Sequence, residues 1–208
     1  MLKKLKRIEV EEKLKNLGLE VFTPVEFRRI FGVSSNTASF FINSNLKSGL
    51  FIKIRNGFYI LKDSHPSHYF VANKLYQPSY ISLEKALSHY GIIPEVVYTI
   101  TSVTTKVPRE FDTPIGAFSY QRIKKEAFTG YSLRQLDREE VLCAEPEKAL
   151  ADYLYFVDLK KISLNDRLEL KDINKTKLVV YIKLFGRPRM LKLVDEIYAH
   201  YRQPRKVY

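Results

Sequence analysis

The sequence predicts an α+β protein in two domains, a small one at residues 1–63 and a larger, mixed one at residues 66–208. Three observations support this prediction. Helical apolar spacing and a β-hairpin signal follow one another within the first sixty residues. β-rich segments then gather between residues 97 and 144, and helical patterns return from residue 146 onward. The linker is expected at Asp63-Ser-His-Pro-Ser-His68.

The charge is concentrated in the small domain. The chain of 208 residues has 35 Lys and Arg against 23 Asp and Glu, a net charge of +12, and residues 1–62 account for +7 of it with 12 against 5. Such an excess favours a nucleic acid, an anionic membrane surface or an acidic protein as partner. No apolar run exceeds five residues and no secretion signal is recognisable, so we expect a soluble, cytoplasmic protein with no membrane partner. The single cysteine, Cys143, excludes an intramolecular disulfide and is expected to be buried.

Three helices are predicted before residue 50. The first spans residues 3–17, with Leu5, Ile8, Leu14 and Leu17 as its apolar stripe and a glycine following it. Thr23-Pro-Val-Glu26 has the form of a capping box and opens the second helix, which ends near residue 32. Ser34 caps the third, which runs to about residue 48. Two short helices joined by a tight glycine turn are typical of a helix-turn-helix.

The third helix has two different faces. Ala38, Phe41, Ile42 and Leu46 form an apolar face that should pack inward. The opposite face carries amides, hydroxyls, a lysine and an aromatic ring, with no carboxylate to repel a DNA backbone. Asparagine can bond adenine edges, hydroxyls and lysine can bond phosphates, and a phenyl ring can lie against a thymine methyl. The predicted DNA contacts on this helix are Ser35, Asn36, Thr37, Ser39, Phe40, Asn43 and Lys47.

A β-hairpin should follow the third helix. Asn56-Gly57 lies between two β-rich runs in residues 50–61, which is the strongest short hairpin signal. In a winged helix-turn-helix this hairpin is the wing, and Lys53, Arg55 and Asn56, with Lys62, would then lie along phosphates or in the minor groove. The alternative is a small helical bundle with an ordinary solvated basic face.

The larger domain is predicted to contain a central antiparallel sheet between helices. Helices are expected at residues 66–76, 82–90, 146–156, 174–185 and 188–201. Strands are expected at residues 97–105, 117–123, 129–133 and 140–144, with a short strand and a turn in residues 109–116. The basic end at residues 202–206 could contact phosphate, although a solvated terminus is the simpler interpretation.

Seven segments of this domain, spread over about residues 70–155, form a recognisable series of motifs. They are Ala72-Asn-Lys-Leu-Tyr76, Pro78-Ser-Tyr-Ile-Ser-Leu-Glu-Lys-Ala-Leu87, Tyr90-Gly-Ile-Ile-Pro94, Thr101-Ser-Val-Thr-Thr105, Thr113-Pro-Ile-Gly116, Phe118-Ser-Tyr120 and Pro146-Glu-Lys-Ala-Leu150 with Asp152. In this order they resemble the AbiEi-type antitoxins of type IV toxin-antitoxin (abortive infection) systems, and the predicted winged helix upstream matches that family's layout.

The resemblance implies a phage-defence antitoxin of two domains. Its winged helix would bind operator repeats in double-stranded DNA and repress its own operon. Its C-terminal domain would counteract a nucleotidyltransferase-like toxin, without requiring a stable complex with it. A transcriptional regulator with a ligand-sensing or protein-docking C-terminal domain is the alternative.

No catalytic residues, metal ligands or cofactor are predicted, so the chain is not expected to be an enzyme. Asp158, Glu169 and Lys171 have the loose spacing of a metal-dependent nuclease, but surface charges are the favoured interpretation. His65, His68 and His89 lack the cysteine or carboxylate that would complete a metal site. Walker and GxSxG motifs are absent.

Overall fold

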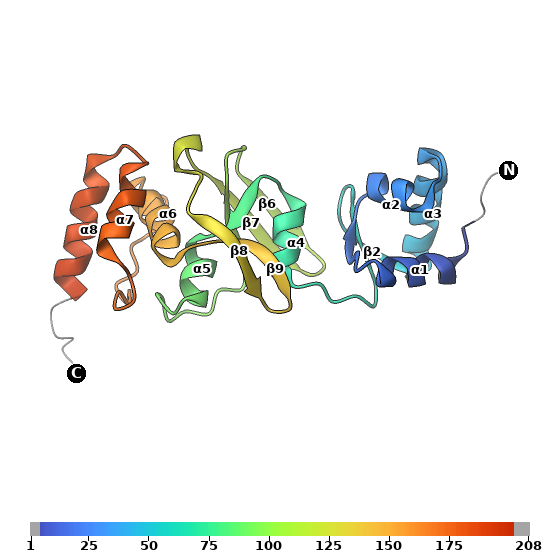
Figure 1. Ribbon diagram of the computed structural model, residues 1–208, viewed down its shortest axis with the longest axis horizontal. Coiled ribbons are helices and arrows are strands. Elements are labelled where there is room, and N and C mark those ends of the chain that lie inside the picture. The colour runs from blue at the N-terminus through green and yellow to red at the C-terminus, as the bar shows by residue number, and fades with distance from the viewer. Residues whose placement is uncertain (1–4, 202–208) are drawn as a thin grey trace.

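The structure is a computed structural model that describes residues 5–201, and the protein is α+β. The first two residues of the helix predicted at 3–17, and the basic segment 202–206, lie outside the described residues. Figure 1 shows α1 to α3 at one end of the longest axis, the strands of the larger sheet in the middle, and α6 to α8 at the other end.

The first six elements are three helices and the three strands of a small sheet. They are α1 (Arg7–Asn16), β1 (Val21–Phe22), α2 (Pro24–Phe31), α3 (Ser35–Lys47), β2 (Phe51–Arg55) and β3 (Phe58–Leu61). The predicted apolar stripe of α1 is partly wrong, because Val10 and Leu14 form its buried stripe whereas Ile8 is 71% exposed. The helix begins at Arg7, and the i, i+4 spacing of Val10 and Leu14 faces the core.

The ends of α2 and α3 are as predicted. The Thr23 hydroxyl accepts a hydrogen bond from the Glu26 amide while the Glu26 carboxylate accepts one from the Thr23 amide, which completes the capping box. Gly32 ends α2 with φ +62°, a left-handed conformation that favours glycine. Ser34 then caps α3 by accepting from the Thr37 amide at 3.1 Å.

The small sheet has the strand order β1-β3-β2 and is covered on both faces. The face toward the helices buries Phe22, Phe51, Tyr59 and Leu61 with α1 to α3. The other face carries Val21, Ile54 and Ile60, which are buried in the same apolar cluster as the rest of the chain. Residues 1–63 therefore pack against the part that follows through their sheet.

The remaining elements form a second sheet with helices around it. They are α4 (His68–Leu75), β4 (Ser79–Ile81), α5 (Leu83–His89), β5 (Ile100–Thr104), β6 (Arg109–Thr113), β7 (Gly116–Arg122), the 3-10 helix η1 (Lys125–Ala127), β8 (Tyr131–Leu136), β9 (Glu139–Ala144), α6 (Pro146–Asp158), α7 (Lys175–Lys183) and α8 (Pro188–Tyr201).

The prediction of a central antiparallel sheet is confirmed only in part, because the six strands form a mixed sheet in the order β6-β7-β5-β4-β9-β8. β4 pairs in parallel with β9, and β5 in parallel with β7, while the other neighbours are antiparallel. The sequence analysis missed β4, the three-residue strand between β5 and β9, because it is too short to show a period-two pattern. The β6–β7 hairpin is placed so that β7, not β6, lies beside β5.

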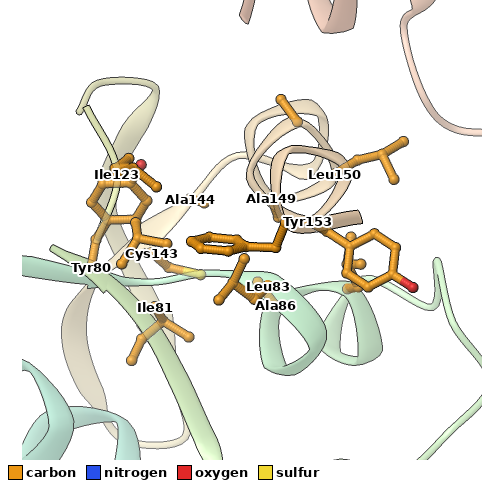
Figure 2. Close-up of a cluster of buried hydrophobic side chains, with 14 of the residues drawn as sticks. Tyr80, Ile81, Leu83, Ala86, Ile123, Cys143, Ala144, Ala149, Leu150 and Tyr153 are labelled. Carbon is orange, nitrogen blue, oxygen red and sulfur yellow. The ribbon is translucent and has the colours of Figure 1, made fainter. Parts of the chain in front are cut away.

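The core of this region lies where α6 crosses α5 and the sheet. Figure 2 shows Ala149 and Tyr153 of α6 facing Leu83 and Ala86 of α5, with Cys143 of β9 beside them. Cys143 is fully buried, as predicted. The N-cap residue of α5, Ser82, does not cap it with its side chain, because its hydroxyl donates to Asp152 at 2.7 Å.

A fully buried ion pair lies in the same core. Lys148 and Asp152, one turn apart on α6, pair with each other, and both side chains are 0% exposed. The Asp152 carboxylate also accepts hydrogen bonds from the Tyr80 and Ser82 hydroxyls. Complete burial raises the pKa of Asp152, and the ammonium of Lys148 opposes that shift. Because these groups have no access to solvent, they are part of the core and are not offered to a substrate.

Candidate nucleic-acid interface

The candidate interface is the outward face of α3, and the packing of α2 against α3 orients it. Phe27 of α2 packs on Phe41 of α3 with ring centroids 5.7 Å apart, and Ala38 and Ile42 are buried beneath them. Burial of this apolar side directs the opposite side of α3 into solvent.

The predicted division of α3 into a buried and an exposed face is confirmed. Asn36, Phe40, Asn43 and Lys47 are all exposed along one line of the helix, and Phe40 is 76% exposed. Ser39 is exposed beside them, and α3 contains no acidic residue. We call the surface formed by Asn36, Ser39, Phe40, Asn43 and Lys47 the α3 face.

Two of the predicted contact residues, at the start of α3, make side-chain contacts within the protein. The Ser35 hydroxyl accepts a hydrogen bond from the Arg28 guanidinium at 3.0 Å. The Thr37 hydroxyl lies 2.9 Å from that of Ser34 and is half-buried. Both side chains hold the α2–α3 turn as well as facing outward.

Arg28 is a candidate that the sequence analysis missed. It is exposed on the last turn of α2 and is held beside the start of α3 by its bond to Ser35. The available signal was the pair Arg28-Arg29 immediately before the turn, which places positive charge next to the α3 face.

The hairpin forms as predicted, with Gly57 in the turn at φ +82°. Lys53 is exposed and pairs in register with Tyr59, so it lies on the sheet face that carries the helices. Asn56 is exposed in the turn itself. Both side chains are therefore open to solvent.

The structure does not bring Arg55 to that surface. Its guanidinium donates to the Leu75 carbonyl at 2.6 Å and lies over the rings of Phe58 and Phe111, 4.5 and 4.6 Å from their centroids. Burial lowers the pKa of Arg55, although an arginine stays charged at neutral pH. The guanidinium therefore contacts the second part of the chain at Leu75 and Phe111. A cation over an aromatic ring is attracted to it, so these contacts hold Arg55 away from the α3 face.

The linker is also held against the larger sheet. The Ser67 amide, at its end, donates to the Glu139 carboxylate of β9 at 3.0 Å. Burial raises the pKa of Glu139, and Glu20, which precedes β1, adds to that shift. Three features together hold the orientation of α3 relative to the larger sheet. They are the packing of the small sheet, the contacts of Arg55 with Leu75 and Phe111, and the hydrogen bond of the linker.

The residues weighed for a nuclease or a metal site lie in other surroundings. The Asp158 carboxylate pairs with Arg187, and His68 lies edge-on to Phe118. Within residues 5–201 no three His, Cys, Asp or Glu side chains are grouped so that they could hold a metal ion. Over the same residues, no helix has the length and apolar character needed to span a bilayer.

No protein-family model matches this chain, and no curated protein matches it either.

Proposed function

We propose that residues 1–63 form a winged helix-turn-helix domain that binds double-stranded DNA, and that the chain is a cytoplasmic, non-enzymatic antitoxin that represses its own operon. In this proposal α2 and α3 are the helix-turn-helix and the β2–β3 hairpin is the wing. The observation that carries the DNA-binding part is the α3 face, which is exposed, carboxylate-free and rich in side chains that read bases.

The chemistry of the α3 face suits the major groove. Asn36 and Asn43 can each bond an adenine edge through two hydrogen bonds, and Phe40 can lie against a thymine methyl. Lys47 is placed to neutralise a phosphate at the last turn of the helix. The net +7 of residues 1–62 favours association with the duplex before any base is read.

The wing contacts differ from those expected from sequence. Lys53 and Asn56 are exposed and are proposed to contact the backbone or the minor groove. Arg28 joins the phosphate contacts beside the start of α3. Arg55 is assigned instead to the contact between the two parts of the chain.

DNA binding is tested by fluorescence anisotropy with the DNA upstream of the chain's own gene and with unrelated duplexes, over a range of salt concentrations. Lys47→Ala should weaken binding to all duplexes alike and make the salt slope shallower by about 1. Asn43→Ala should cost about 1–3 kcal/mol of discrimination between the upstream DNA and the others. Lys192→Ala on α8 and Asn16→Ala on α1, both exposed, are the matched controls and should change neither quantity. Unchanged affinity in both α3 variants would contradict the proposal.

The antitoxin part rests on the resemblance of residues 70–155 to the AbiEi-type family. It is tested by co-expression with the gene adjacent to this one, which should encode a nucleotidyltransferase-like toxin. The chain should restore growth, and Lys47→Ala should restore it equally while repressing more weakly, because neutralisation is assigned to the C-terminal part. If the adjacent gene is harmless when expressed alone, the antitoxin part of the proposal is contradicted. The DNA-binding part is unaffected by that result.

A second candidate function is a transcriptional regulator whose C-terminal domain senses a small ligand. The observation that favours it is a basic cleft at the end of the larger sheet, lined by Arg122, Lys124 and Lys125. A ligand that changes operator affinity, with no rescue of cells that express the neighbouring gene, would support it over the antitoxin.

A further inference from the structure

A cleft of about 600 Å³ lies between the larger sheet and the C-terminal helices, far along the chain from the α3 face. Its volume falls within the range of about 300–1,000 Å³ that is usual for small-molecule sites. It is lined by Thr105, Arg122, Ile123, Lys124, Lys125 and Tyr155.

The mixed topology of the sheet creates this cleft. β5 and β7 are parallel neighbours and Thr104 pairs with Arg122, so the carboxyl ends of both strands lie at one edge. Thr105 follows the first strand, and residues 123–125 follow the second into η1. Crevices outside the carboxyl ends of parallel strands are the usual ligand sites of open α/β sheets. A purely antiparallel sheet would have sent these two segments to opposite edges.

Tyr155 of α6 borders the cleft on its other side. The Lys124 ammonium donates to the Phe185 carbonyl at 2.8 Å, which ties the segment before η1 to the residues that follow α7. Tyr155 of α6 stacks on Phe185 with centroids 4.6 Å apart and an interplanar angle of 22°.

The cleft is strongly positive. Three of its six lining residues are cations and none is a carboxylate. Among the described residues, Arg122 and Lys125 take part in no ion pair, whereas Arg187 pairs with Asp158. Like charges that converge on one cleft repel each other unless an anion lies between them.

We propose that this cleft binds a nucleoside polyphosphate of the ADP or ATP class, with the phosphates held by Arg122 and Lys125 and the base beside Tyr155. The guanidinium can bond two phosphate oxygens at once, and the ammonium adds a point charge. The Thr105 hydroxyl is a further donor. One face of the Tyr155 ring is covered by Phe185, so a base would stack on the opposite face. A concave site of this volume favours a small molecule over the backbone of a long nucleic acid.

The proposal goes beyond DNA binding and does not depend on it. It is tested with the full-length protein by isothermal titration calorimetry, using ADP and ATP as ligands and adenosine, pyrophosphate and a single-stranded oligonucleotide as comparisons. ADP and ATP should bind at one site, adenosine should not bind measurably, and pyrophosphate should bind at least about tenfold more weakly than ADP.

Charge-removing variants locate the site. Arg122→Gln and Lys125→Gln should each weaken ADP binding about tenfold or more, which is the usual loss for a charge-assisted hydrogen bond. Arg138→Gln and Lys192→Gln, exposed cations of the larger part that do not line the cleft, are the controls and should leave ADP affinity within about twofold. All four should retain the circular dichroism spectrum and the affinity for upstream DNA of the parent chain.

Four results would overturn the proposal. The first is that neither ADP nor ATP binds, and the second is that Arg122→Gln binds ADP as tightly as the parent chain does. The third is that pyrophosphate binds as tightly as ADP. The fourth is that only the oligonucleotide binds and that Arg122→Gln weakens its binding. The last would identify the cleft as a nucleic-acid surface. Failure of the α3 variants in the DNA assay would leave the calorimetric result unaffected, so the two proposals fail separately.

Discussion

Replacing Lys148 by methionine should destabilise the protein strongly, because the substitution leaves the buried Asp152 carboxylate without its counter-ion. Both side chains are 0% exposed, so neither water nor another cation can replace the lost ammonium without opening the core. Removing one partner of a buried pair typically costs about 3–5 kcal/mol. The whole stability of a domain is only about 5–15 kcal/mol, so the effect should be easily measured.

The structure offers a matched control and a rescue. Lys175→Met breaks the ion pair with Asp195, whose side chain is 74% exposed, and should cost less than about 1 kcal/mol. Asp152→Asn, added to Lys148→Met, removes the unpaired charge but keeps an oxygen that can accept from the Tyr80 and Ser82 hydroxyls. The double variant should therefore be more stable than Lys148→Met alone.

The pH dependence gives a second signature. Burial already raises the pKa of Asp152 above its ordinary value of 3.8, and loss of Lys148 removes the main opposing influence. Folded Lys148→Met then binds a proton at Asp152 that the unfolded chain releases, so its stability should fall as the pH rises above about 3.8. The double variant lacks this carboxyl and should not show the dependence.

The assay is urea unfolding of the full chain, followed by circular dichroism and by tyrosine fluorescence, since the sequence has no tryptophan. A cost for Lys148→Met no greater than that for Lys175→Met would refute the reasoning. So would the same pH dependence in the single and double variants.

Three further predictions concern other contacts. Arg55→Ala should lower the melting temperature by removing the bond to Leu75 and the ring contacts, and should leave the salt slope of DNA binding unchanged; a shallower slope would return Arg55 to the DNA interface. In urea unfolding, Glu139→Gln should be more stable than the parent chain at neutral pH, because the parent must ionise a carboxyl whose pKa is raised by burial. Below the ordinary glutamate pKa of 4.5 the variant should be no more stable than the parent. A gain in stability at low pH alone would contradict this reasoning. Burial raises the pKa of the Cys143 thiol to about 11, so a thiol reagent at pH about 8 should label only unfolded protein, and rapid labelling of the native chain would show that β9 opens.

Local signals predicted most of the elements correctly. The capping box at Thr23, the Gly32 turn, the Ser34 cap and the Asn56-Gly57 hairpin each depend on residues within a few positions of one another, and all formed as predicted. The exposed and buried faces of α3 followed from its helical period.

The errors occurred where distant segments meet. The parallel pairings of β5 with β7 and of β4 with β9 were missed because a strand's own sequence does not specify which neighbour it takes. Arg55 was predicted at the DNA surface because its place beside a hairpin turn suggested exposure. Its real surroundings are Leu75 and Phe111, far away in the sequence.

Composition and local pattern were thus sufficient for the α+β class, for the basic character of the first sixty residues and for the face of α3 that meets solvent, since each depends on residue type and short-range spacing. The packing of the small sheet against the rest of the chain, the buried Lys148–Asp152 pair and the basic cleft at the carboxyl ends of β5 and β7 depend on which strands and helices become neighbours. That choice is made by burial of apolar surface over the whole chain, so it became visible only in three dimensions.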